Sequence, residues 1–108
     1  MTFKHFIGID VAKAKLDIAS GPDGPVETIA NDSVAISESI KKLPKPKSAL
    51  IVVEATGGYE KQLVLELVDA GHIVSVVNPR QVRDFAKAIG TLAKTDKIDA
   101  RVIARFGQ

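Results

Sequence analysis

The hydrophobic pattern of this chain changes its period near residue 33, and that change limits the folds the chain can adopt. Before it, three short runs rich in apolar and β-branched residues, at 6–11, 15–19 and 26–30, are typical of strands. Glycine and proline are dense in the segment 21–25 and predict a turn there. The start of the chain is therefore expected to form three antiparallel strands.

After residue 33, strand and helix patterns alternate along the chain. A continuous apolar run at 49–53 predicts a strand that is buried on both faces, and the segment 73–77 predicts another buried strand. Apolar residues at helical spacing predict helices before, between and after these two strands. The predicted helices are one capped by Ser33, one that stops at Gly71, one that starts at Asn78-Pro79 and one capped by Thr95.

This alternation of strand and helix implies right-handed crossovers, which pair the later strands in parallel. The expected fold class is α/β, with a mixed five-stranded sheet flanked by helices. Three antiparallel strands followed by two parallel ones is the strand order of the RNase H-like fold, to which RuvC-like domains belong.

Composition excludes several kinds of protein. The chain contains no cysteine, which excludes disulfides and thiolate metal sites and favours an intracellular protein. No apolar run reaches the roughly 18 residues of a membrane span, so no membrane partner is expected.

Charge is distributed unevenly along the chain. Residues 1–77 carry 8 Lys and Arg against 10 Asp and Glu, a net charge of −2. Residues 78–108 carry 7 Lys and Arg against 3 Asp and Glu, a net charge of +4. A polyanion such as DNA would be attracted to this C-terminal part, although a solvated helix face is the alternative interpretation.

The helix predicted after Pro79 separates its apolar and basic residues. Val82, Phe85, Ala86 and Ile89 share one face, which is expected to be buried, and the basic residues share the other. Basic side chains continue beyond this helix and would suit contacts with phosphates. The candidate nucleic-acid-binding residues are Arg80, Arg83, Lys87, Lys94, Lys97, Arg101 and Arg105.

Two acidic residues occupy unusual places in the predicted sheet. Asp10 interrupts an apolar strand, where an ionised carboxylate is costly unless a cation or hydrogen-bond donors compensate it. Glu54 ends the apolar run 49–53, and ligand groups in α/β sheets gather at the carboxyl ends of parallel strands. For each residue alone, an ordinary solvated position is the alternative.

Asp96 and Asp99 lie three residues apart at the start of the last predicted helix, so both carboxylates share one face. Acids in a first helical turn also stabilise the helix dipole, which is the simpler explanation for this pair alone. Neither His5 nor His72 has the spacing of a metal ligand, and both are expected at the surface or at an edge.

The four acids together suggest a metal site. The strand that contains Asp10 is expected beside the strand that ends at Glu54, and the last helix can fold back to bring Asp96 and Asp99 over them. Four carboxylates in one place would repel one another, and hard cations such as Mg²⁺ or Mn²⁺ would relieve that repulsion. Two such ions are the usual arrangement for in-line attack at a phosphodiester.

Four segments with these spacings, 8–13, 54–60, 77–82 and 94–100, resemble the N-terminal domain of IS110-type transposases. The resemblance covers nearly the whole of residues 1–108. It implies a RuvC-like domain whose Asp-Glu-Asp-Asp set falls on Asp10, Glu54, Asp96 and Asp99, as catalytic residues and metal ligands.

The resemblance also implies a function. Such a domain takes part in metal-dependent DNA recombination during transposition, guided by a structured RNA, in the cytoplasm of a prokaryotic cell. Family members are longer, are expected to form homo-oligomers and carry a second domain with a serine nucleophile. Residues 1–108 are therefore expected to be a fragment without that domain and with little or no activity alone.

Two other functions remain open from the sequence. An actin- or hexokinase-like nucleotide-binding fragment shares the opening strand pair with an early aspartate, and Gly57-Gly58 could form a phosphate loop. A non-catalytic module for nucleic-acid binding or assembly could share the same fold, because a fold does not determine a function.

Overall fold

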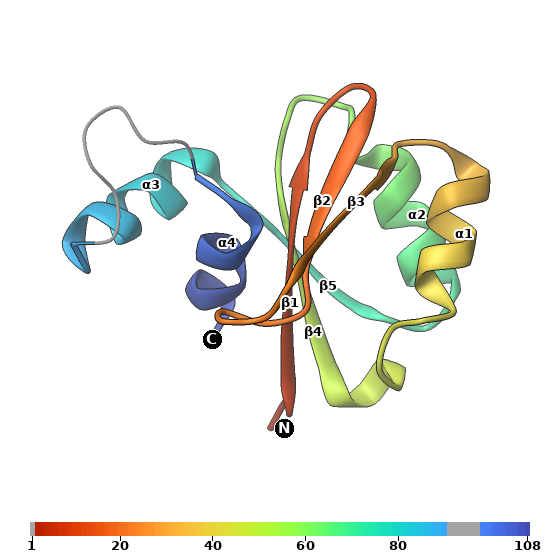
Figure 1. Ribbon diagram of the computed structural model, residues 1–108, viewed down its shortest axis with the longest axis horizontal. Helices are drawn as coiled ribbons and strands as arrows, with labels where there is room; N and C mark the ends of the chain where they lie inside the picture. Colours follow the sequence, from red (N-terminus) through yellow and green to blue (C-terminus); the bar gives the residue numbers. More distant parts are fainter. Residues whose placement is uncertain (1, 91–97) are drawn as a thin grey trace.

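A five-stranded mixed sheet separates two layers of helices, as Figure 1 shows. The computed structural model describes residues 2–90 and 98–108. The strands are β1 (His5–Val11), β2 (Lys15–Ala19), β3 (Val26–Ala30), β4 (Ala49–Glu54) and β5 (Ile73–Val77). The helices are α1 (Ser33–Ile40), the short 3-10 helix η1 (Pro46–Ser48), α2 (Lys61–Asp69), α3 (Pro79–Ala88) and α4 (Ala100–Gly107).

The strand order across the sheet is β3-β2-β1-β4-β5. The pairs β1–β2 and β2–β3 are antiparallel, whereas β1–β4 and β4–β5 are parallel. This confirms the fold predicted from the sequence, a mixed sheet with the RNase H-like strand order. Strand β1 lies at the centre, so a residue on it has neighbours on both sides.

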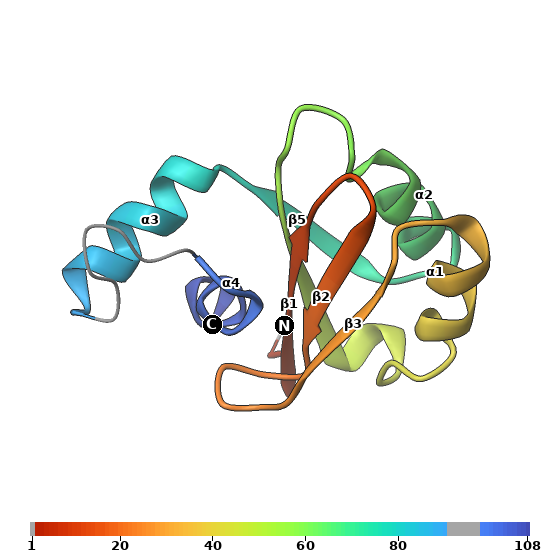
Figure 2. The same cartoon turned by 45° about the horizontal axis from the view of Figure 1, so that its top comes forward.

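The two faces of the sheet have separate cores, because side chains alternate along each strand. Ile7 and Ile9 of β1 pack with Ile36 of α1 and Leu67 of α2 on one face. On the other face, the core contains Val52 of β4 together with residues of α3 and α4. Figure 2 shows α3 and α4 on one side of the sheet and α1 and α2 on the other.

Helix α4 packs closely against β1 because Gly8 has no side chain. A Cβ atom at Gly8 would overlap with the carbonyl oxygen of Ala100 and the backbone nitrogen of Ala104. At the other end of α4, a Cβ atom at Gly107 would overlap with the side chain of Val52. The backbone of α4 therefore lies almost directly on the sheet, on the face that also carries Asp10.

Helix starts agree with the sequence at α3 and differ at α1 and α4. Asn78 caps α3 as predicted, with its side-chain oxygen accepting from the Arg80 backbone nitrogen at 2.7 Å. Asp32, rather than Ser33, caps α1, since its carboxylate accepts from the Ala35 backbone nitrogen at 2.8 Å. Helix α4 begins at Ala100 with Asp99 as its cap, whereas the predicted cap Thr95 lies outside the described residues.

Three predictions of exposure were wrong. Strand β5, expected to be buried, lies at the edge of the sheet, and Val76 on it is 48% exposed. Ile89, expected in the core, is 42% exposed, because α3 ends at Ala88 and Ile89 forms its cap. His72, expected at the surface or at an edge, directly precedes the edge strand β5 but is only 7% exposed. Its backbone nitrogen bonds to the Leu67 carbonyl, which turns the chain directly from α2 into the sheet, and burial lowers the pKa of the imidazole.

Candidate functional site

Asp10 and Glu54 lie at the carboxyl ends of two neighbouring parallel strands. The register of β1 and β4 pairs Ile9 with Val53, so the two acids are the next residues along each strand. Both belong to the face on which Gly8 and α4 meet, and both border an open cavity of about 550 Å³. The cavity is lined by Asp10, Ala12, Lys15, Asp17, Glu54, Pro79, Arg83 and Ile98.

The carboxyl group of Glu54 is partly buried beside another negative charge. Its Oε2 atom is buried and has no hydrogen-bond partner among the described residues. Burial raises the pKa of Glu54 above its usual range, and the charge of Asp10 raises it further, while Arg83 opposes both effects. The position of Glu54 therefore disfavours the charged form of its carboxyl group.

A divalent cation would suit this pair of acids. Mg²⁺ and Mn²⁺ prefer oxygen donors, and the unpaired Oε2 atom of Glu54 is such a donor next to Asp10. Within residues 2–90 and 98–108, no three acidic or histidine side chains gather closely enough to hold a metal ion. The described residues thus fit part of a metal site and do not complete one.

Two further charged residues of the cavity, Asp17 and Lys15, were not identified from the sequence. Asp17 stands directly opposite Asp10 in the β1–β2 ladder, and its Oδ1 atom accepts from the hydroxyl of Thr28 at 2.6 Å. The tight turn at 12–14 fixes this register, so the sequence did contain the signal. Asp17, Asp10 and Glu54 form a row of acids across three adjacent strands.

The loop that follows Glu54 is closed by its own hydrogen bonds. The Oε1 atom of Glu60 accepts from the Thr56 hydroxyl at 2.6 Å and from the backbone nitrogens of Thr56 and Gly58 at 3.1 Å each. The Thr56 hydroxyl bond is the main reason why the pKa of Glu60 falls to about 2, and the backbone donors add to it. These donors are unavailable to a phosphate, which argues against Gly57-Gly58 as a nucleotide-binding loop.

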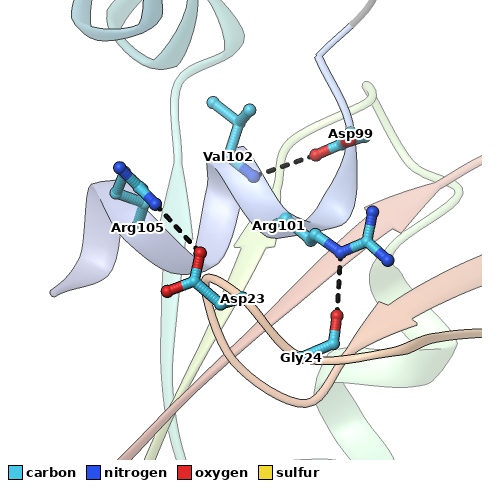
Figure 3. A network of polar contacts seen from close by, with 6 residues as sticks. All are labelled: Asp23, Gly24, Asp99, Arg101, Val102 and Arg105. Atoms are coloured by element: carbon cyan, nitrogen blue, oxygen red, sulfur yellow. Dashed lines mark hydrogen bonds and ion pairs between the residues drawn. The ribbon is translucent and has the colours of Figure 1, made fainter. Parts of the chain in front are cut away.

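Asp99 lies at the start of α4 and acts as its cap. Its carboxylate accepts from the Val102 backbone nitrogen at 3.0 Å, as Figure 3 shows. The side chain is exposed and borders a smaller pocket with Pro22 and Arg101, apart from the cavity that contains Asp10 and Glu54. Asp96 lies outside the described residues. Convergence of all four acids therefore stays a prediction, and the structure brings together Asp10 and Glu54.

The predicted basic residues divide into two groups. Arg83 borders the cavity, and Arg80 and Lys87 are exposed on α3, where Lys87 continues the stripe of Arg83 one turn further along. Arg101 and Arg105 contact the turn between β2 and β3 instead, as described next. Lys94 and Lys97 lie outside the described residues. Helix α3 therefore carries the basic surface that leads into the cavity.

The turn between β2 and β3 reaches across to α4. The Nε atom of Arg101 donates to the Gly24 carbonyl at 2.8 Å, and Arg105 forms an ion pair with Asp23 at 3.3 Å (Figure 3). The Asp23 side chain is 92% exposed, so this ion pair adds little stability. Both arginines are partly committed to contacts within the protein.

Comparison with known proteins identifies the family. The family model for DEDD transposases of the IS110 type, described as "Transposase", matches residues 7–108. The chain belongs to the IS110 family. Pilin gene-inverting proteins of Moraxella lacunata and Moraxella bovis are each 34% identical to it over 110 residues. The match covers 96% of the chain and 34% of each relative, so the chain spans about a third of the length of these curated relatives.

Membership of the IS110 family agrees with the features of the cavity. A DEDD transposase domain implies a divalent metal and DNA binding, and both acidic and basic side chains line the cavity. No described helix is long and apolar enough to cross a bilayer.

Proposed function

We propose that residues 1–108 are the RuvC-like domain of an IS110-type recombinase that acts on phosphodiesters of DNA. Asp10 and Glu54 supply two of the metal ligands, and Asp96 and Asp99 supply the others. The observation that carries this proposal is the buried Oε2 atom of Glu54, which has no hydrogen-bond partner within residues 2–90 and 98–108 and lies beside the charge of Asp10. A buried carboxylate without a partner is unfavourable unless a ligand compensates it.

The residues around the cavity can place a phosphodiester over the acids. Lys15 enters from β2, on one side of Asp10 and Glu54, and Arg83 enters from α3, on the other. Positive side chains on both sides would bind phosphates and hold the backbone of DNA across the acidic floor. Two bound Mg²⁺ or Mn²⁺ ions would supply the charge stabilisation that in-line attack at phosphorus requires. Pro79 and Ile98 add apolar atoms to the lining of the cavity.

The whole protein is proposed to need more than this domain. Its relatives are about three times longer than the matched region, which leaves room for the second, serine-bearing domain that the family resemblance implies. The relatives are named for inverting a pilin gene, which supports site-specific rearrangement of DNA as the reaction class. Guidance by a structured RNA, self-association and a cytoplasmic location in a prokaryotic cell belong to the same proposal.

Divalent metal is expected to raise the melting temperature of the 108-residue chain. A cation that binds only the folded state stabilises it by mass action, by about 2.7 kcal/mol when its concentration is 100 times Kd. Asp10→Asn should remove most of this stabilisation. Asp69→Asn, at an exposed position on α2, is the control with the same chemical change and should retain it. A parent melting temperature that does not respond to millimolar Mg²⁺ or Mn²⁺ would contradict the proposed site.

Nucleic-acid binding is expected to depend on the basic stripe of α3. Replacing Arg80, Arg83 and Lys87 with Gln should reduce the salt dependence of duplex DNA binding, by about 0.9 log unit per log unit of salt for each lost phosphate contact. The control variant replaces Lys41, Lys45 and Lys47 with Gln, which removes the same charge from the α1 side of the protein. Equal salt slopes for the two triple variants would show that α3 is only a solvated surface.

A further inference from the structure

The side-chain amide of Asn31 connects the loops that follow the two strands carrying Asp10 and Glu54. Its Nδ2 atom donates to the Ala12 carbonyl at 2.9 Å and to the Tyr59 carbonyl at 3.0 Å. We propose that Asn31 is a positioning residue that sets the separation of Asp10 and Glu54 through these two bonds. The inference rests on the proposed metal-binding function and adds to it a residue outside the acidic set.

Both bonds end close to the acids. Ala12 comes two residues after Asp10 and lines the same cavity. Tyr59 belongs to the loop between Glu54 and α2. Figures 1 and 2 both show the turn after β1 and the loop after β4 at the same end of the sheet. A single side chain therefore ties together the two places where the chain leaves the site.

The loop after Glu54 is stiff enough to transmit such a constraint. Glu60 accepts three hydrogen bonds from Thr56 and Gly58, which close the loop on itself. At its start, the Ala55 backbone nitrogen donates to the Val77 carbonyl at 3.0 Å and holds the loop to β5. The bond from Asn31 to Tyr59 thus acts on a loop that is fixed to the end of β4.

A connection between the two loops is needed at this end of the sheet, because the pairing of β1 with β4 ends there. The register of β1 and β4 extends to Ile9 and Val53, just before the two acids. Beyond that pair, the carboxylates of Asp10 and Glu54 repel each other across neighbouring strands. The backbone nitrogen of Asn31 also donates to the Ala14 carbonyl at 3.0 Å, which fixes Asn31 itself against the β1–β2 turn.

Two substitutions of Asn31 separate position from charge. Asn31→Asp has nearly the same shape but no N–H donor, and it adds a negative charge near the acids. If Asn31 affected cations only through local charge, this variant would bind Mn²⁺ more tightly. If Asn31 acts by position, both Asn31→Asp and Asn31→Ala should bind Mn²⁺ more weakly, because ligands that are no longer held in place bind metal poorly.

The experiment titrates the 108-residue chain with Mn²⁺ and records metal affinity together with melting temperature. The control is Ser48→Ala, which also removes one side-chain bond to a backbone carbonyl, from Ser48 Oγ to Lys45 at 2.8 Å, at the opposite end of β4. We expect both Asn31 variants to lose about 10-fold or more in Mn²⁺ affinity, and Ser48→Ala to keep the parent affinity. Parent affinity in Asn31→Ala, or a loss of the same size in Ser48→Ala, would overturn the inference. Should Asn31→Asp fail to fold, Asn31→Ala decides.

Amide hydrogen exchange distinguishes failure of this inference from failure of the proposed function. If the parent chain binds no Mn²⁺, the proposed metal site is wrong for this chain. The exchange data then test only whether the two side-chain bonds of Asn31 hold the two loops together. Faster exchange in Asn31→Ala at 12–15 and 56–61 together, with the rest of the sheet unchanged, would support it. Unchanged exchange in either loop, or faster exchange throughout the sheet, would overturn it.

Discussion

Replacing Gly8 with alanine is expected to lower the free energy of unfolding by about 3 kcal/mol, the upper end of the usual cost of overpacking. The new Cβ atom would overlap with backbone atoms of Ala100 and Ala104, and backbone in a helix cannot move aside as a flexible side chain can. Helix α4 would have to move away from β1 and expose its buried residues, among them Ile103. Chemical denaturation followed by circular dichroism measures the loss.

The matched control for this change is Gly21→Ala. Gly21 lies in the turn between β2 and β3, where a Cβ atom would meet nothing within 4 Å. The same added methyl group should therefore change stability by less than about 0.5 kcal/mol, as is usual for surface positions. Similar losses for the two variants would mean that α4 does not pack on Gly8 as the structure shows.

Replacing Glu54 with glutamine is expected to change two properties in opposite directions. Without metal, the variant should be more stable than the parent at neutral pH by about 1 kcal/mol, because the neutral amide removes a partly buried charge and its repulsion from Asp10. With Mg²⁺ or Mn²⁺, the variant should gain almost no stability, since the amide is a poor substitute for a carboxylate ligand. Thermal unfolding with and without metal measures both effects.

The pH dependence of the Glu54→Gln effect follows from the raised pKa. Burial and the charge of Asp10 raise the pKa of Glu54 in the folded state above 4.5, so folding favours the protonated carboxyl. The parent therefore has no penalty below about pH 4.5 and acquires it as the pH rises through the folded-state pKa. The metal-free stability difference should be small at acidic pH and largest at neutral pH. Glu38→Gln, on an exposed position of α1, is the control, and a parent more stable than Glu54→Gln at neutral pH would contradict the prediction.

Hydrophobic patterning was sufficient to predict the sheet and the meeting of Asp10 and Glu54. The strands at 6–11 and 49–53 are short apolar runs with clear ends. Their parallel pairing follows from the helical segment that separates them in the sequence. Once β1 and β4 are neighbours, two acids at their carboxyl ends must lie side by side.

The start of α4 could not be predicted in the same way, because two residues with capping side chains, Thr95 and Asp99, lie four positions apart. The sequence does not say which one the helix uses, and the structure uses Asp99. That choice also uses the Asp99 carboxylate to cap the helix, since it accepts from the Val102 backbone nitrogen.

Asn31 was missed for a different reason. Its two side-chain bonds reach residues 19 and 28 positions away, and neither partner is recognisable from sequence because each is a backbone carbonyl. Backbone acceptors occur at every residue, so only the folded chain shows which of them an amide reaches.

The contact at Gly8 gives α4 a single register on the sheet. A slip of one residue would rotate the helix by about 100° and bring Ile103 or Arg105 to the place of Ala104, where only a small residue fits. Gly8 and Asp10 lie two residues apart on the same face of β1, a distance of about 7 Å along the strand. The height of the first turn of α4 above Asp10 is therefore set largely by this close contact, and with it the separation of the Asp99 cap from the sheet.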